Sequence, residues 1–182
     1  MTAPTSTPPT ADGTPSRWNR GRVLATVAVV GMVAMWGYVL YLAFVPGRQP
    51  PPDRLEDPSF GRAAQEVCST ALDDVAALPR AVQTESAVER AGIVTEANDR
   101  FLAMVDDLEP LAPGGEDGEI VAEWLADWRT YLDDRERFAG ALRVDPGSRM
   151  LVSPKDGQHI TEHLDAFAAD NGMRSCATPL DV

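Results

Sequence analysis

The chain has 182 residues and a formal net charge of -12, which leaves room for one ordinary domain with appendages. Arg17, Arg20 and Arg22 against Asp12 give a net of +2 before a long apolar segment, so the rest of the chain carries -14. This acidic excess repels phosphate groups and argues against binding to nucleic acids or to anionic lipid headgroups. It suits a solvated surface or a basic partner.

The first 22 residues are predicted to form a cytoplasmic tail that ends in basic residues. Residues 1–16 are rich in proline, threonine and serine. A segment of this composition buries too little apolar surface to offset the entropy lost on ordering, so we expect it to be disordered.

Residues 23–45 contain no charged side chain and predict a transmembrane helix, because at about 1.5 Å per residue they span a hydrocarbon core of about 30 Å. A cleaved signal peptide has a shorter apolar run of roughly 7–15 residues, followed by small residues. Three arginines precede the segment closely, whereas Arg48 and Arg54 follow it, which favours an N-terminus on the inside. We therefore expect a single-pass protein of the cell membrane with its C-terminal domain outside.

Residues 46–58 are predicted to be an extended, semi-rigid linker, since they contain five prolines and prolines favour an open, stiff chain. The acidic outer domain then covers residues 59–182.

Apolar residues at three- and four-residue steps predict three helices at the start of this domain. The first covers about 60–78 and ends at Pro79, the second covers 84–109 and ends before Pro110, and the third covers 119–143. Residues 113–118 are expected to be a loop. The predicted buried stripe of the second helix includes Leu102 and, unusually for a stripe, Asn98.

A small β-hairpin is predicted next, because apolar runs flank the sequence Ser-Pro-Lys-Asp-Gly at 153–157 and this composition suits a turn. Thr161 is then expected to cap a last helix that ends before Gly172. The predicted fold class is mainly α: one transmembrane helix and an outer domain resembling a four-helix bundle, with Trp124 and Trp128 in its core.

The two cysteines, Cys68 on the first outer helix and Cys176 after the last one, are expected to form a disulfide. A cysteine pair in one small domain outside the membrane is usually bridged. The alternative is a buried thiol and a second free thiol near the end of the chain.

The other polar groups are interpreted as surface or structural residues and not as metal-binding or catalytic sites. His159 and His163 are four residues apart but lack further metal ligands, and residues 116–119 lack the spacing of a calcium loop. The acid pairs at 73–74, 106–107 and 133–134 are expected to face water. Asn98 is interpreted as a structural polar residue in the core; alternatively, it lines a pocket with Trp124 and Trp128.

One succession of residues in the outer domain is distinctive: Trp124, Leu125, Trp128, Tyr131, Asp134, Arg135, Phe138, Ile160, Thr161 and Asn171 to Cys176. In this succession the domain resembles a group of uncharacterised actinobacterial single-pass membrane proteins. It implies a similar anchored helical domain and brings no assigned activity.

These observations favour a non-enzymatic interaction or accessory module that acts on another membrane or cell-envelope protein. No catalytic motif, cofactor-binding loop or metal-ligand spacing is evident in the sequence. The alternative is an outer domain that binds a small molecule or a cation.

Overall fold

The structure, a computed structural model, describes residues 17–44, 51 and 53–181. These belong to two compact units, with the boundary between Gln49 and Pro50. The described chain is mainly helical and has a two-stranded hairpin before the last helix, as the sequence predicted.

The first unit contains helix α1, Arg17–Phe44. Its stretch Gly21–Leu42 has a mean hydropathy of 2.1 and exposed side chains, and it is the one described helix that is long and apolar enough to cross a membrane. The helix begins six residues before the predicted span, because nothing in its polar start prevents backbone hydrogen bonding as a proline would. The predicted tail at 1–16, Val45 and residues 46–50 and 52 of the predicted linker lie outside the described residues.

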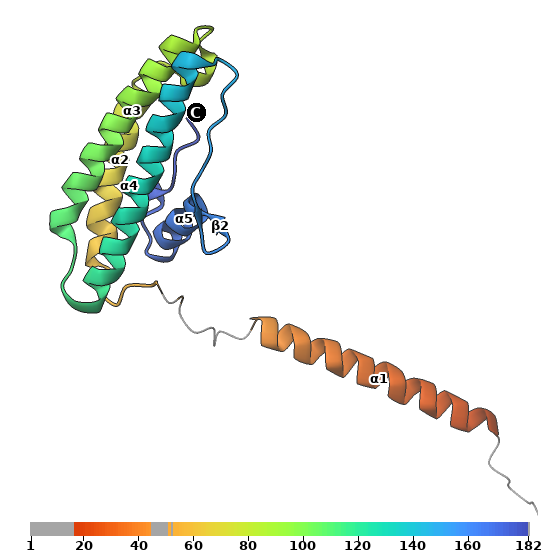
Figure 1. Ribbon diagram of the computed structural model, residues 1–182. Coiled ribbons are helices and arrows are strands. Elements are labelled where there is room, and N and C mark those ends of the chain that lie inside the picture. Colours follow the sequence, from red (N-terminus) through yellow and green to blue (C-terminus); the bar gives the residue numbers. More distant parts are fainter. Residues whose placement is uncertain (1–16, 45–50, 52, 182) are drawn as a thin grey trace, which may run out of the picture. The chain divides into compact units, whose positions relative to one another are not determined.

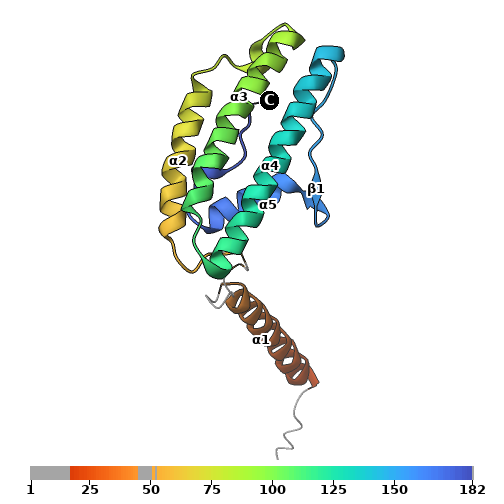
Figure 2. The same ribbon diagram turned by 60° about the vertical axis from the view of Figure 1, so that its left-hand side comes forward.

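Three long helices lie side by side in the second unit (Figures 1 and 2). They are α2 (Ser59–Ala76), α3 (Ala87–Leu108) and α4 (Gly115–Val144), and the short 3-10 helices η1 (Ala81–Gln83) and η2 (Glu109–Leu111) lie between them. The predicted loop at 113–118 was too long, because α4 begins at Gly115. The acidic side chains of Glu116 and Asp117 occupy its first turn, where negative charge stabilises a helix.

The predicted hairpin is confirmed, with β1 (Pro154–Lys155) antiparallel to β2 (Gln158–His159). Asp156 and Gly157 form its turn with positive φ angles of 48° and 81°, the region that glycine adopts without strain. Helix α5, Ile160–Asp170, follows directly. Its N-cap is His159 and not Thr161, so the helix begins two residues earlier than predicted, with the buried Ile160 as its first residue.

The helical domain also begins earlier than predicted. Leu55, which we assigned to the linker, is buried in the core. Its backbone N–H donates to Asn171 Oδ1 over 2.9 Å, and the N–H of Glu56 donates to the Asp117 carboxylate over 3.1 Å. An apolar side chain and two long-range hydrogen bonds thus join residues 53–58 to the domain.

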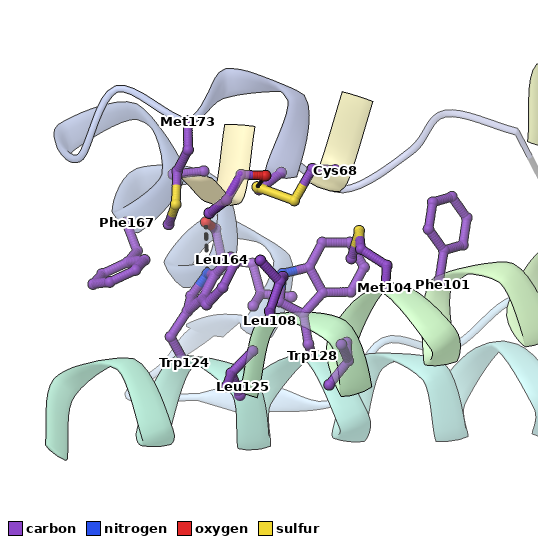
Figure 3. Packing of buried hydrophobic residues seen from close by; sticks show 14 of the residues in the cluster. Cys68, Phe101, Met104, Leu108, Trp124, Leu125, Trp128, Leu164, Phe167 and Met173 are labelled. Atoms are coloured by element: carbon purple, nitrogen blue, oxygen red, sulfur yellow. Dashed lines mark hydrogen bonds between the residues drawn. A yellow bond between two sulfur atoms is a disulfide. The ribbon is translucent and has the colours of Figure 1, made fainter. Parts of the chain in front are cut away.

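Aromatic side chains form the main core of the domain (Figure 3). The Trp124 ring contacts Phe167 with ring centroids 5.1 Å apart, and meets Phe60 and Trp128 edge to face at 6.3 and 6.4 Å. The predicted Cys68–Cys176 disulfide closes the same region by joining α2 to η3 (Arg174–Cys176), with 5.1 Å between the Cα atoms. The end of the chain is therefore covalently attached to the first helix of the domain.

Candidate binding groove

The fourth helix of the domain is short, and an irregular segment follows it beside the long helices. Helix α5 has 11 residues whereas α4 has 30. After η3 the chain continues without helix or strand beside the long helices, toward the end of α4 (Figure 1). We call residues 177–181 the C-terminal strap.

The strap ends at a guanidinium group in the interior of the domain. Arg135 of α4 is fully buried. Its Nη1 and Nη2 atoms each donate to one carboxylate oxygen of Asp181, both over 2.7 Å, and its Nε donates to Asn98 Oδ1 over 2.8 Å. The rings of Phe101 and Tyr131 lie 5.4 and 5.7 Å from the guanidinium carbon. Such a bidentate pair is the strong form of a charge-assisted hydrogen bond.

Electrostatics favour the charged state of this pair. Burial by itself lowers the pKa of Arg135, but the hydrogen bonds and the negative charge of Asp181 outweigh it, so the pKa lies above its ordinary value. For the Tyr131 hydroxyl, whose charged form is the anion, burial raises the pKa, so the hydroxyl stays protonated. Asp181 thus provides the counter-charge for a cation that has no access to water.

A groove lies beside the strap, at the end of the domain where α2 ends and α3 begins. Its volume is about 450 Å³, and Pro179, Leu180 and Asp181 of the strap form part of its lining. The other lining residues are Leu72, Val75, Ala76, Leu78, Pro79, Arg80, Ala81, Val82, Ile93 and Ala97. Val82 is 58% exposed and Leu180 fully exposed, so the apolar lining continues onto the open surface.

The groove resembles ligand sites in its volume and in its lining. Its volume falls in the range of about 300–1,000 Å³ that is typical of ligand sites, which combine apolar walls with a few polar groups. Exposed apolar surface that is contiguous with a groove marks interaction sites in soluble domains. Arg80 and Asp181 are its charged lining residues, and Asp181 is already paired with Arg135.

A second, smaller hollow of about 190 Å³ lies over the hairpin and the start of α4. Lys155 Nζ donates there to Glu123 over 2.7 Å and to Asp127 over 2.6 Å. The hydrogen bond from Lys155 and its charge lower the pKa of Glu123. Burial opposes the charge of Lys155, but the hydrogen bonds with Asp127 and Glu123 prevail and raise its pKa. These contacts attach the hairpin to α4.

Asn98 belongs to the polar core, as we interpreted it. Its side-chain amide is buried, donates to the Leu132 carbonyl over 2.9 Å and accepts from Arg135. Trp124 and Trp128 are buried among the aromatic rings. Trp124 lines the smaller hollow, whereas neither Asn98 nor Trp128 lines that hollow or the groove; a pocket shared by these three residues stays a prediction.

Two predictions about exposure were wrong. Leu102 is 45% exposed, because it points away from the neighbouring helices that Phe101 and Val105 contact. The expectation that acid pairs face water holds for residues 73–74 and 106–107 but fails for Asp134, which is buried. Its carboxylate accepts from the backbone N–H of Ser153 over 2.6 Å and also pairs with Arg137. Asp134 therefore positions the segment that leads into the hairpin.

The remaining polar candidates have structural partners. His163 Nε2 lies 3.1 Å from the Lys155 carbonyl oxygen, while His159 is exposed on the hairpin. Within residues 116–119, which we compared with a calcium loop, the Asp117 carboxylate accepts hydrogen bonds from the backbone N–H groups of Glu56 and Asp57. Among the described residues, no three His, Cys, Asp or Glu side chains are grouped to hold a metal ion.

Sequence reasoning missed Arg135 as a buried group and missed Asp181 and the groove entirely. Arg135 carried a usable signal, because it lies four residues after Tyr131 and three before Phe138, on the buried side of α4.

Comparisons with protein-family models, curated proteins and solved structures find no match for this chain.

Proposed function

We propose that the chain is a membrane-anchored docking module without catalytic activity. In this proposal α1 crosses the cell membrane, the helical domain lies outside, and the groove receives an apolar segment of another membrane or cell-envelope protein. The groove is the observation that carries the proposal, because it combines apolar walls with the exposed side chains of Val82 and Leu180.

Two further observations support this assignment. The disulfide suits a domain outside the cytoplasm, since cytosolic thiols are kept reduced. Residues 53–58 join the domain near Asn171 and the start of α4, at the end opposite to the groove (Figure 1). Residues 53–58, with which the helical domain begins, therefore do not line the groove.

Site-specific photocrosslinking in intact cells tests the proposal. A photoreactive side chain in place of Val82 should give a discrete protein adduct, whereas the same side chain in place of the exposed Val144 should not. Ala76 is exposed and lines the groove, so the Ala76→Trp variant should fill the groove and remove the adduct. Ala126→Trp, on an exposed position of α4, is the matched control and should preserve it. Equal adducts from positions 82 and 144, or an adduct unaffected by Ala76→Trp, would contradict the proposal.

The binding of a small apolar molecule in the same groove is a second candidate function. The volume of about 450 Å³ favours it, because it is adequate for a ligand of ordinary size. Native mass spectrometry of the full chain separates the two. A small molecule would add a constant mass that the Ala76→Trp variant loses, and a protein docking module would carry no such mass.

A further inference from the structure

We propose that the helical domain contains a carboxylate receptor beside the groove, and that a partner segment with an apolar residue followed by an acidic one docks there by displacing the C-terminal strap. This inference rests on the proposed function and names the chemistry of the docked segment.

The receptor is built by the long helices and not by the strap. Arg135 and Tyr131 come from α4, and Asn98 comes from α3. Asn98 fixes the guanidinium through Nε, which leaves Nη1 and Nη2 directed at the carboxylate of Asp181. A preorganised guanidinium fork of this kind accepts any carboxylate that reaches it in the same plane.

The strap forms polar contacts at Thr178 and Asp181, and residues 177–179 are half-buried. The backbone N–H of Thr178 donates to Asp165 over 2.7 Å, and Asp181 forms the pair with Arg135. Leu180 is fully exposed and therefore buries no apolar surface. An incoming carboxylate would restore the ion pair that Asp181 gives up, so the exchange sacrifices the hydrogen bonds at Thr178 and the partial burial of residues 177–179.

The strap also indicates which partner fits. The carboxylate that occupies the receptor belongs to Asp181, which follows Pro179 and Leu180 in the strap. The groove beside it is apolar and open, so a partner with larger apolar side chains before its acid would bury surface that Leu180 leaves exposed. Arg80 lines the groove and forms no ion pair with the described residues, which adds attraction for an acidic segment in an otherwise acidic domain.

The disulfide limits how far the strap can move. Cys176 is bonded to Cys68, and the five residues from there to Asp181 span at most about 17 Å when fully extended. The strap therefore remains close by as an internal competitor of the partner segment. Its effective concentration weakens the binding of any external segment until the strap is loosened.

Peptide binding to the full-length protein in detergent micelles tests this inference. The probe is a fluorescent, amide-ended peptide of residues 177–182, and the control peptide has asparagine in place of the aspartate. The acidic peptide should bind, and the asparagine peptide should not. Fluorescence anisotropy with both peptides on the unaltered chain gives the answer without any variant.

Two variants sharpen the test. Asp165→Ala releases Thr178 while the pair between Arg135 and Asp181 stays intact, and it should lower the apparent Kd of the acidic peptide at least about fivefold. Asp170→Ala changes an exposed acid on the same helix and should leave that Kd unaltered. Equal binding of the two peptides, or equal affinities of the two variants, would overturn the carboxylate receptor.

The results also distinguish this inference from the proposed function. Peptide binding without a crosslink at Val82 in cells would keep the receptor and reject the docking function. A crosslink that depends on the groove, without peptide binding, would keep the docking function and assign the partner a different chemistry.

Discussion

The two ends of the helical domain differ in how they are stabilised. Around the disulfide, α5 completes the bundle and Trp124 contacts three other aromatic rings. At the groove end, the second buried cluster has six residues, of which Ala81, Ala91 and Ala139 are alanines, and an extended strap takes the place of a helix. One end thus has a large covalently closed core, and the other has small side chains, an ion pair and open apolar surface. This difference supports the proposed docking at the groove end, because binding regions come from the less stable parts of a fold.

The largest effect should come from the aromatic core. Trp124→Ala removes a nearly fully buried ring and should lower the free energy of unfolding by about 3–5 kcal/mol. Val82→Ala, at the exposed side of the groove, should change it by less than about 0.5 kcal/mol. Urea unfolding of the full chain in detergent, followed by circular dichroism, measures both. Losses of similar size would remove the distinction between the two ends.

Loss of the disulfide comes next. The bond closes a separation of 108 residues, and the paired Cys68→Ala and Cys176→Ala substitutions should lower the free energy of unfolding by about 2–4 kcal/mol, because the unfolded chain gains freedom. The same unfolding experiment applies, with the reduced, unaltered chain as a second comparison. A destabilisation below about 1 kcal/mol would show that the bridge does not dominate its end of the domain.

The ion pair at the groove end should have a smaller effect. Asp181→Asn keeps the shape of the side chain but leaves the buried Arg135 without its counter-charge. The free energy of unfolding should fall by about 2–3 kcal/mol. This is less than for a fully buried ion pair, because the Asp181 side chain is 25% exposed. Asp170→Asn is the surface control and should be close to neutral. If the two variants proved equally stable, Asp181 would not be the counter-charge on which the strap depends.

The pH dependence of the hairpin should be the smallest effect. Glu123 has a lowered pKa through Lys155, so its stabilising contribution is present above the ordinary carboxyl range and disappears as the pH falls through the lowered value. Lys155 has a raised pKa, and its contribution disappears only as the pH rises through that value. Lys155→Met should therefore flatten the loss of stability between neutral and acidic pH, measured by thermal unfolding. An unchanged slope would contradict this role of Lys155.

The regular parts of the fold were predictable because local periodicity determines them. Leu125, Trp128 and Leu132 recur at helical spacing, and the boundaries at Pro79 and Pro110 follow from the missing N–H of proline. The disulfide followed from the predicted compartment. Gly115 and Leu55 were misassigned because tertiary contacts, namely the Asp117 carboxylate and the core itself, extend order into segments of proline and glycine.

The candidate site was less predictable because it depends on long-range pairing. Arg135 lies in a run of charged residues, which favours an exposed surface, although its spacing from Tyr131 places it on the buried side of α4. Asp181 is 46 residues further along the chain, in a segment without periodicity. Sequence patterns give no signal for such a contact, and the groove that it borders is a consequence of the short length of α5.

In the proposed topology α1 crosses the cell membrane and the helical domain lies outside. A membrane-impermeant maleimide on intact cells tests this, because the native cysteines are bonded to each other and only introduced thiols react. Val144 is 87% exposed, so the Val144→Cys variant should be labelled before the membrane is permeabilised, and the Thr5→Cys variant only afterwards. Labelling of the Thr5→Cys variant in intact cells, or protection of the Val144→Cys variant until permeabilisation, would contradict the account.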